Sequence, residues 1–187
     1  MGTSAEKSEK PNNQSLSKSI NTDISNKYNK NSNVIEDKKE QNVDCKIMLE
    51  FHNKYRERHK SNKLKIKPEL NDKANEYAKY LVEQNSLTNQ NIFNMDENLG
   101  ENIFFSDKKE KVINVCNKWY NENKNFKYGL NNFQKDTNHF TQLIWNSTTD
   151  VGFGFYNTDN IYCYVALYYP QGNIFGQFTN NVFMPKE

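Results

Sequence analysis

The sequence predicts an α+β protein, a three-layer α-β-α sandwich around a small antiparallel sheet. Helical patterns precede two strands, which lie at 150–156 and 160–170. Both faces of the second strand are apolar or aromatic, with Cys163 on one face and Tyr164 on the other. A sheet that is apolar on both faces must be covered on both faces, and the preceding helices supply that cover.

Two helices are predicted in the first part of the folded region. Apolar residues at helical spacing predict a helix over 45–59, with Asp44 as its N-cap. Pro68 is typical of a first helical position and opens a second helix over 68–84. The apolar stripe of the first helix consists of Ile47, Met48, Phe51 and Tyr55.

The region between the second helix and the strands alternates loops with short elements. Residues 60–67 are predicted to be a linker, and 99–105 ("LGENIFF") a short extended segment. Asp107 is the predicted cap of a third helix over 108–123, whose apolar residues fall on one side. A fourth, short helix is predicted over 138–146.

Composition divides the chain into a tail and a domain. Residues 1–44 are crowded with Asn, Ser, Lys and Glu, which predicts a disordered polar tail. Residues 45–187 hold both tryptophans and nearly all the other aromatic residues, so they are predicted to form one domain. The net charge of +2 is too small to indicate a nucleic-acid partner. No stretch is long and apolar enough to predict a transmembrane segment.

Cysteine usage and the N-terminus leave the compartment open. Cys45, Cys116 and Cys163 cannot all pair within one chain, so a dense disulfide framework is excluded. No N-terminal segment is apolar enough to predict a signal peptide. The protein is expected to be secreted if such a peptide was removed. Otherwise it is expected to be intracellular, and membrane association is then an open alternative because Gly2 follows Met1 as in acylated proteins.

Four separated segments resemble the CAP superfamily of cysteine-rich secretory, antigen 5 and pathogenesis-related 1 proteins, whose shared module is also called the SCP domain. They are "FHNKYRERH", "LGENIFF", "NHFTQLIWNST" and "YYPQGNIFG", in that order. The resemblance runs from about residue 45 to the C-terminus. It implies the α-β-α sandwich that the patterning also predicts. Ala166 stands where the family usually has a cysteine, so the chain resembles a disulfide-poor member.

The resemblance also implies a cleft with two His and two Glu that can hold a divalent metal. Three positions match: His139 in "HFTQ", Glu101 in "GEN" and Glu122 in "WYNE". Asn89 in "SLTNQ" stands where the second His is expected. One imidazole and two carboxylates suit Zn²⁺ or Mg²⁺, but an amide is a poor zinc ligand, so the metal cleft is expected to be partly degenerate. The alternative is that both carboxylates only accept hydrogen bonds.

The other two histidines are interpreted as structural or peripheral. In the family's "HNxxR" pattern, His52, Asn53 and Arg56 are expected to form hydrogen bonds between helices. His59 lies near a helix C-terminus, where a cation is favoured, and is expected to be exposed.

The loop before "HFTQ" indicates the function. In the family this loop is associated with sterol binding, and apolar side chains in a polar loop can provide a surface for a lipid. The alternative is that its rings pack onto the domain's own helices. The residues predicted to bind lipid are Phe126, Tyr128, Leu130 and Phe133, with Lys124, Lys127 and Lys135 beside them.

The predicted function is therefore non-enzymatic binding of a sterol or other lipid. No Ser or Cys lies in a recognisable activating motif, so no catalytic residue is assigned. Two alternatives from other classes stay open. One is a protein-interaction module, as a homodimer or with another protein, that uses the same cleft. The other is a metal-dependent hydrolase.

Overall fold

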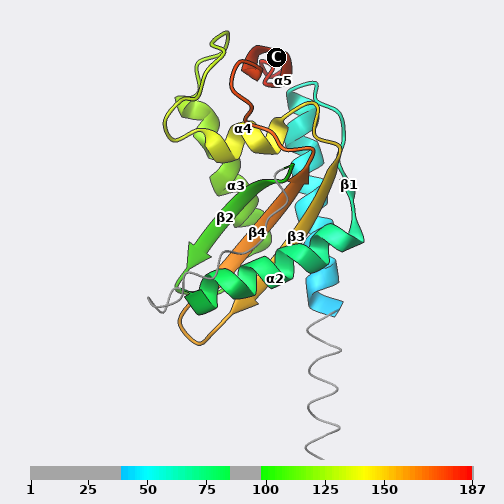
Figure 1. The fold of residues 1–187 in the computed structure, drawn as a ribbon, viewed down its shortest axis with the longest axis vertical. Coiled ribbons are helices and arrows are strands. Elements are labelled where there is room, and N and C mark those ends of the chain that lie inside the picture. Colours follow the sequence, from blue (N-terminus) through cyan, green and yellow to red (C-terminus); the bar gives the residue numbers. More distant parts are fainter. Residues whose placement is uncertain (1–38, 85–97, 187) are drawn as a thin grey trace, which may run out of the picture. The chain divides into compact units, whose positions relative to one another are not determined.

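The computed structural model describes residues 39–84 and 98–186 (Figure 1). The chain divides into two compact units, residues 1–40 and residues 41–187, and the fold described below is that of the second. The disorder predicted for the tail falls mostly on residues outside the described ones. No helix in the described part of the chain is long and apolar enough to cross a membrane.

The first described helix covers 39–58 and begins earlier than predicted. Residues 39–44, assigned to the tail from their polarity, are helical, so Asp44 lies inside the helix and is not its N-cap. Polar residues carry no apolar period, and periodicity therefore could not detect this extension. The buried residues of the helix are Cys45, Met48, His52, Tyr55 and Arg56, whereas Ile47 and Phe51 of the predicted stripe are only partly buried.

The sheet has four strands in the order β1-β3-β4-β2. β2 (Gly100–Ser106) and β3 (Asp150–Asn157) both pair antiparallel with β4 (Tyr162–Tyr169). β1 (Lys65–Ile66) pairs parallel with β3, so the sheet is mixed and the predicted linker contains a strand. Two residues are too few to show a strand period, which is why the pattern missed β1.

α2 (Pro68–Gln84) covers one face of the sheet (Figure 1), with the bounds predicted from the sequence. Gly152 and Gly154 allow this close packing. A Cβ atom on Gly154 would lie 2.1 Å from the carbonyl carbon of Ala74, and one on Gly152 would lie 2.2 Å from that of Leu70. The apolar contacts on this face involve Ala74, Ala78, Val82, Cys163, Val165 and Leu167.

Asparagine side chains of α2 also satisfy backbone groups of β3. Asn71 and Asn75 accept hydrogen bonds from the backbone N–H groups of Phe153 and Phe155, each at 2.8 Å. β1 pairs only with Asp150 and Val151, so these two N–H groups lie beyond its reach. The helix therefore closes the part of the β3 edge that the short strand leaves open.

The opposite face is covered by helix 39–58 and by the helical elements that follow β2. These are α3 (Val112–Asn121), the 3-10 helix η1 (Glu122–Asn125) and α4 (Asn138–Ile144), while α5 (Phe178–Asn181) lies beyond the strand ends (Figure 1). The larger core lies here and includes Trp119, Phe140, Trp145, Phe153 and Tyr168. Both faces are thus covered, and the three-layer α-β-α sandwich is confirmed.

Four details of these helices differ from the prediction. α3 begins at Val112 with Lys111 in the cap position, so Asp107 is not the cap. The end of the predicted helix belongs instead to the separate 3-10 helix η1. α4 ends at Ile144, and α5 was not predicted because four residues show no helical period.

The "HNxxR" residues form structural hydrogen bonds, but of the three only Arg56 joins two helices as predicted, while His52 bonds to β4 and Asn53 to the backbone of Leu64. Arg56 is fully buried, and its guanidinium donates to the carbonyl oxygens of residues 62, 143, 145 and 148 at 2.6 to 3.0 Å. Asn53 exchanges two hydrogen bonds with the backbone of Leu64. Arg56 therefore ties the end of α4 to helix 39–58 through backbone carbonyls, with its charge spread over four acceptors.

Candidate functional site

His139 and Glu122 form a pair at the first turn of α4. The His139 Nδ1 atom lies 2.5 Å from Glu122 Oε1. The other carboxylate oxygen, Oε2, accepts the backbone N–H groups of His139 at 2.9 Å and Phe140 at 3.1 Å. The cap residue Thr137 makes no side-chain cap hydrogen bond, so Glu122 caps α4 from η1.

The surroundings of Glu122 determine the protonation state of its carboxyl group. Burial by itself would raise the pKa of the Glu122 carboxyl, but hydrogen bonds from His139 and from the Phe140 backbone outweigh burial and hold the pKa below its ordinary value. Glu122 is therefore an anion that accepts the Nδ1–H of His139. The imidazole is 39% exposed, and Nε2 is the ring nitrogen left for a ligand.

Two further residues position His139. The Trp119 ring stacks on the imidazole with a centroid distance of 6.3 Å and an interplanar angle of 17°. Asn102 Nδ2 donates to the His139 carbonyl oxygen at 2.9 Å and to the Tyr168 hydroxyl at 3.1 Å. Asn102 was not predicted as a site residue. It stands next to Glu101 in "GEN", and strand alternation predicts only that these two side chains lie on opposite faces, not which of them lies toward α4.

A buried hydrogen-bond chain extends from Asn102 into the core. Asn102 donates to the Tyr168 hydroxyl, which lies 2.9 Å from His52 Nε2, and His52 Nδ1 lies 2.7 Å from the Met48 carbonyl oxygen. Only one assignment satisfies all these contacts: Tyr168 donates to Nε2, and the Nδ1–H of His52 donates to Met48. His52 is therefore neutral. Burial lowers its pKa to about 3, which agrees with this assignment.

Glu101 is not brought together with the His139–Glu122 pair. Because successive side chains of β2 alternate, Glu101 lies on the opposite face from Asn102 and forms a hydrogen bond with Tyr77 of α2. Burial and the Glu101 carboxylate together raise the pKa of Tyr77. Asn89, the fourth position, lies outside the described residues.

The described residues therefore do not assemble the predicted metal site. Within 39–84 and 98–186, no group of three or more His, Cys, Asp and Glu side chains is placed to hold a metal ion. The donor set there amounts to one imidazole nitrogen, because Glu122 is committed to His139 Nδ1 and to two backbone N–H groups. Binding of Zn²⁺ or Mg²⁺ stays a prediction.

The aromatic loop before α4 divides into buried and exposed residues. The Phe126 side chain is buried, with ring contacts of 5.1 Å to Tyr128 and 5.7 Å to Phe140. Leu130 and Phe133 are 46% and 51% exposed. The packing alternative therefore applies to Phe126 and Tyr128, whereas Leu130 and Phe133 remain at the surface, and lipid binding by this loop stays a prediction.

Phe133 forms an exposed aromatic pair with Phe175, which lies on the segment after β4. Phe175 is 72% exposed, and the two ring centroids are 6.3 Å apart. Phe133 also packs edge-on against Phe178 of α5 at 5.3 Å. Asn131 fastens the loop to this segment by donating to the Gly176 carbonyl oxygen and accepting from the Thr179 N–H. Sequence reasoning missed Phe175, although "NIFG" is an apolar pair in a polar segment.

His59 is buried, contrary to the prediction, with 1% of its surface exposed. Its Nδ1 atom lies 2.7 Å from the Phe183 carbonyl oxygen, and its Nε2 atom lies 3.1 Å from the Tyr120 hydroxyl. The chain after α5 returns to the end of helix 39–58 and covers the imidazole, a long-range contact that helical position alone could not indicate. Burial, with a smaller effect from Arg58, lowers the pKa of His59 despite the hydrogen bond to Phe183.

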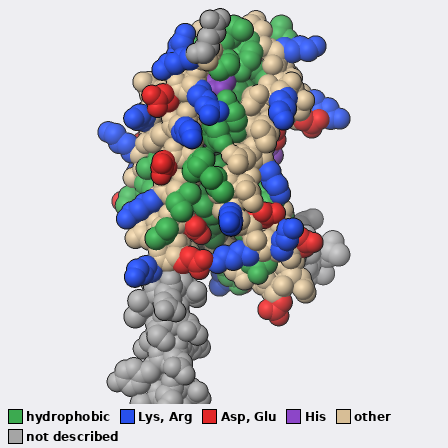
Figure 2. All heavy atoms as spheres, turned by 180° about the vertical axis from the view of Figure 1, so that it is seen from behind, with side chains coloured by type: hydrophobic (Ala, Val, Ile, Leu, Met, Phe, Trp, Pro, Cys, Tyr) green, Lys and Arg blue, Asp and Glu red, His purple; other side chains and the backbone are tan. Residues whose placement is uncertain are grey.

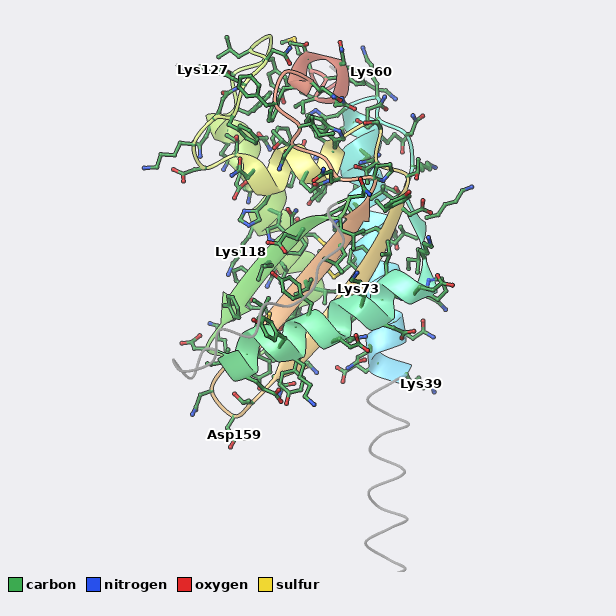
Figure 3. All side chains as sticks on the ribbon, viewed as in Figure 1. Lys39, Lys60, Lys73, Lys118, Lys127 and Asp159 are labelled. Carbon is green, nitrogen blue, oxygen red and sulfur yellow. The ribbon has the colours of Figure 1, made fainter. Side chains whose placement is uncertain are left out.

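Charged groups on the surface are mixed. Figure 2 shows a hydrophobic strip on the face turned away in Figure 1, with Lys and acidic side chains scattered along it. Figure 3 shows Lys127 on the loop between η1 and α4, at the same end of the domain as α5. No single sign of charge dominates the back face, in agreement with the small net charge.

The sandwich, together with a His–Glu pair at the start of a short helix before β3, defines a CAP-type domain. Residues 49–169 match the CAP family, described as the cysteine-rich secretory protein family. Because the match covers more than half of the chain, the chain belongs to this family, as the four sequence segments indicated.

Known relatives agree with this assignment. The chain is 32% identical over 143 residues to the human Golgi-associated plant pathogenesis-related protein 1. The aligned region covers 75% of this chain and 92% of the relative. The chain is also 32% identical over 144 residues to a probable pathogenesis-related protein of Candida albicans, covering 74% of this chain and 66% of the relative.

Solved structures share the fold at lower identity. Schistosoma mansoni venom allergen-like protein 4 superimposes with a TM-score of 0.58 at 22% identity, covering 77% of this chain and 96% of the other. NaASP2, solved with Zn²⁺, has a TM-score of 0.56 at 20% identity, covering 75% and 84% of the two chains. At these identities the likeness shows the fold alone.

Proposed function

We propose that this CAP domain binds a sterol or another lipid without enzymatic turnover, and that Phe133 and Phe175 make the principal contact. The observation that carries the proposal is the exposed aromatic pair, contributed by two segments far apart in the sequence and fastened together by Asn131. The family's association of the loop before "HFTQ" with sterols supports the same choice. Leu130, exposed on that loop, adds apolar surface.

One ring of the exposed pair packs against the buried core. Phe178 beneath Phe133 is buried, and its other ring contact is Trp145 at 5.2 Å. Large apolar side chains that stay exposed to water forgo the free energy that their burial would contribute. A surface of this kind marks a binding site more often than it serves stability.

The size of the expected contribution follows from the exposed fractions. Full burial of a Phe side chain stabilises by about 1.5–3 kcal/mol relative to exposure. With 51% and 72% of the two residues still exposed, burial against a lipid would contribute about 2–4 kcal/mol in total. This corresponds to a loss of affinity of about thirtyfold or more when both rings are removed.

The test is binding to phosphatidylcholine vesicles that contain cholesterol, compared with cholesterol-free vesicles. The Phe133→Ala/Phe175→Ala double variant is expected to lose about thirtyfold in affinity. Phe105→Ala is the matched control, because Phe105 is 45% exposed on β2, outside the aromatic pair. Equal binding by wild type and double variant would remove the pair from lipid recognition.

For a divalent metal we propose a role of Glu122 that differs from direct ligation. Histidines that bind metals commonly donate their other ring N–H to a carboxylate, which orients the ring and raises its basicity. The His139–Glu122 contact has this form, so Glu122 would orient the imidazole and Nε2 would face the ion. Among the described residues no group of three or more candidate ligands is assembled there, and we therefore expect weak binding of Zn²⁺ or Mg²⁺.

The two other function classes predict different results in two further measurements. A homodimer or protein-interaction module would show a concentration-dependent mass without lipid. A metal-dependent hydrolase would show turnover that a chelator abolishes.

A further inference from the structure

We infer that His59 is a proton-sensitive clamp that holds together the two segments bearing the exposed aromatic pair, so that acidification releases them. This inference rests on the proposed lipid-binding function only where vesicle binding is the quantity measured. The clamp itself is a property of the fold and is testable without any lipid.

His59 contacts both segments that carry the pair. Its ring stacks on Tyr128, five residues before Phe133, with a centroid distance of 6.4 Å and an interplanar angle of 20°. Its Nδ1–H donates to the Phe183 carbonyl oxygen, eight residues after Phe175. One imidazole at the end of helix 39–58 therefore joins the loop to the C-terminal segment from beneath.

The hydrogen bonds around His59 require a neutral ring. Nδ1 faces a carbonyl oxygen, so it carries the proton, and Nε2 is then free to accept from the Tyr120 hydroxyl. A second proton on Nε2 would turn that acceptor into a donor. The Tyr120 hydroxyl would have to reverse and find another acceptor for its own hydrogen, in an environment lined by the rings of Tyr55 and Phe140.

Apart from the Phe183 carbonyl oxygen, which already accepts the Nδ1–H, the groups that face His59 do not favour a cation. Arg58 on its own helix opposes protonation by charge repulsion. Tyr120 from α3, Tyr128 from the loop, Phe140 from α4 and Phe183 from the C-terminal segment surround the ring. None of these residues carries an anionic side chain at neutral pH, so a protonated His59 would be a buried and unpaired charge in the closed arrangement.

Release of the clamp would expose His59 to water, where protonation is favourable. The open arrangement therefore binds the proton more tightly than the closed one. Below the ordinary histidine pKa of about 6.5, each further pH unit is expected to shift the open-to-closed ratio by up to about tenfold. His59 stays neutral, and the clamp closed, above that value.

The first test is hydrogen exchange of the full chain at about pH 7.5 and about pH 5.5, on either side of the ordinary histidine pKa and corrected for intrinsic exchange rates. We expect wild type to lose protection in residues 126–134 and 182–185 at the lower pH, while α2 keeps its protection. His59→Asn, which retains an N–H donor near the Nδ1 position but does not titrate, is expected to show no such pH dependence. Equal acid-induced loss in both proteins, or no loss in wild type, would overturn the inference.

A second measurement needs no variant and so does not depend on whether His59→Asn folds. In a titration followed by NMR, the Tyr128 ring signals should shift with the same midpoint as the His59 imidazole. Unrelated midpoints would contradict the clamp.

The vesicle assay separates this inference from the proposed function. With cholesterol-containing phosphatidylcholine vesicles, wild-type binding is expected to weaken from pH 7.5 to about pH 5.5, by at most about tenfold because binding follows the closed fraction, whereas His59→Asn binds with little change. If hydrogen-exchange protection changes with pH but the protein binds no vesicles at any pH, the lipid proposal is refuted and the clamp is upheld.

Discussion

Acidification is expected to destabilise this protein through His52, because the fold buries that imidazole completely and keeps it neutral. Burial lowers the pKa of His52 to about 3 in the folded state, against about 6.5 in the unfolded chain. The unfolded chain therefore binds more protons over this interval, and stability falls as the pH drops below about 6.5. Each pH unit costs about 1.4 kcal/mol, so lowering the pH to about 4.5 removes about 2.7 kcal/mol.

Urea unfolding at a series of pH values measures this slope directly. His52→Gln is the informative variant, because an amide retains hydrogen-bonding capacity toward Tyr168 but cannot take up a proton. We expect it to be less stable than wild type at neutral pH, by about 1–3 kcal/mol, since the Met48 and Tyr168 contacts cannot both be kept. The stability difference should narrow as the pH falls, because the variant lacks the acid-dependent loss. Parallel stability curves for the two proteins between pH 6.5 and about pH 4.5 would refute the assignment of this slope to His52.

Three more predictions concern the site and the packing of α2. Glu122→Gln should cost about 1–2 kcal/mol at neutral pH, because it removes the anion that accepts the His139 side chain and two backbone N–H groups. Since the Glu122 pKa is lowered, that contribution is present above the unfolded carboxyl pKa and is lost as the pH falls through the folded value, so the two proteins should converge in acid. Gly154→Ala should cost about 3 kcal/mol in chemical unfolding, because the new Cβ would meet the α2 backbone at 2.1 Å, whereas Gly129→Ala, with open space around it, should cost about 1 kcal/mol for its positive φ. Calorimetric titration of Zn²⁺ into chelator-treated protein should give weak binding that His139→Ala abolishes, and heat that survives the substitution would exclude His139 as a ligand.

Much of the fold could be predicted from local pattern. The bounds of α2 follow from Pro68 and from the helical spacing of its apolar residues, and the apolar character of both faces of β4 required two helical layers. β1 and α5 carry too few residues to show any period, and the polar start of helix 39–58 carries no apolar signal. Each missed element therefore lacked the repeat on which periodicity depends.

The family, and the identity of the two paired residues at the site, could also be predicted from the sequence. His139 and Glu122 were both assigned to one cleft from the family resemblance, and the structure brings them together. The motif around Glu101 did not reveal that its neighbour Asn102 holds the His139 backbone while Glu101 contacts Tyr77 on the other face of β2. Which of two adjacent polar residues faces a site depends on strand register, and a motif does not state the register.

The sequence by itself determined which residues are apolar, which segments are periodic and which motifs are present. Only the tertiary structure decided how similar residues are used: Phe126 is buried while Phe133 is exposed, and His59 lies under the C-terminal segment rather than in water. The physical reason is that burial depends on what other parts of the chain cover a side chain. Phe183 and His59 are 124 residues apart, and no local pattern encodes a contact over that separation.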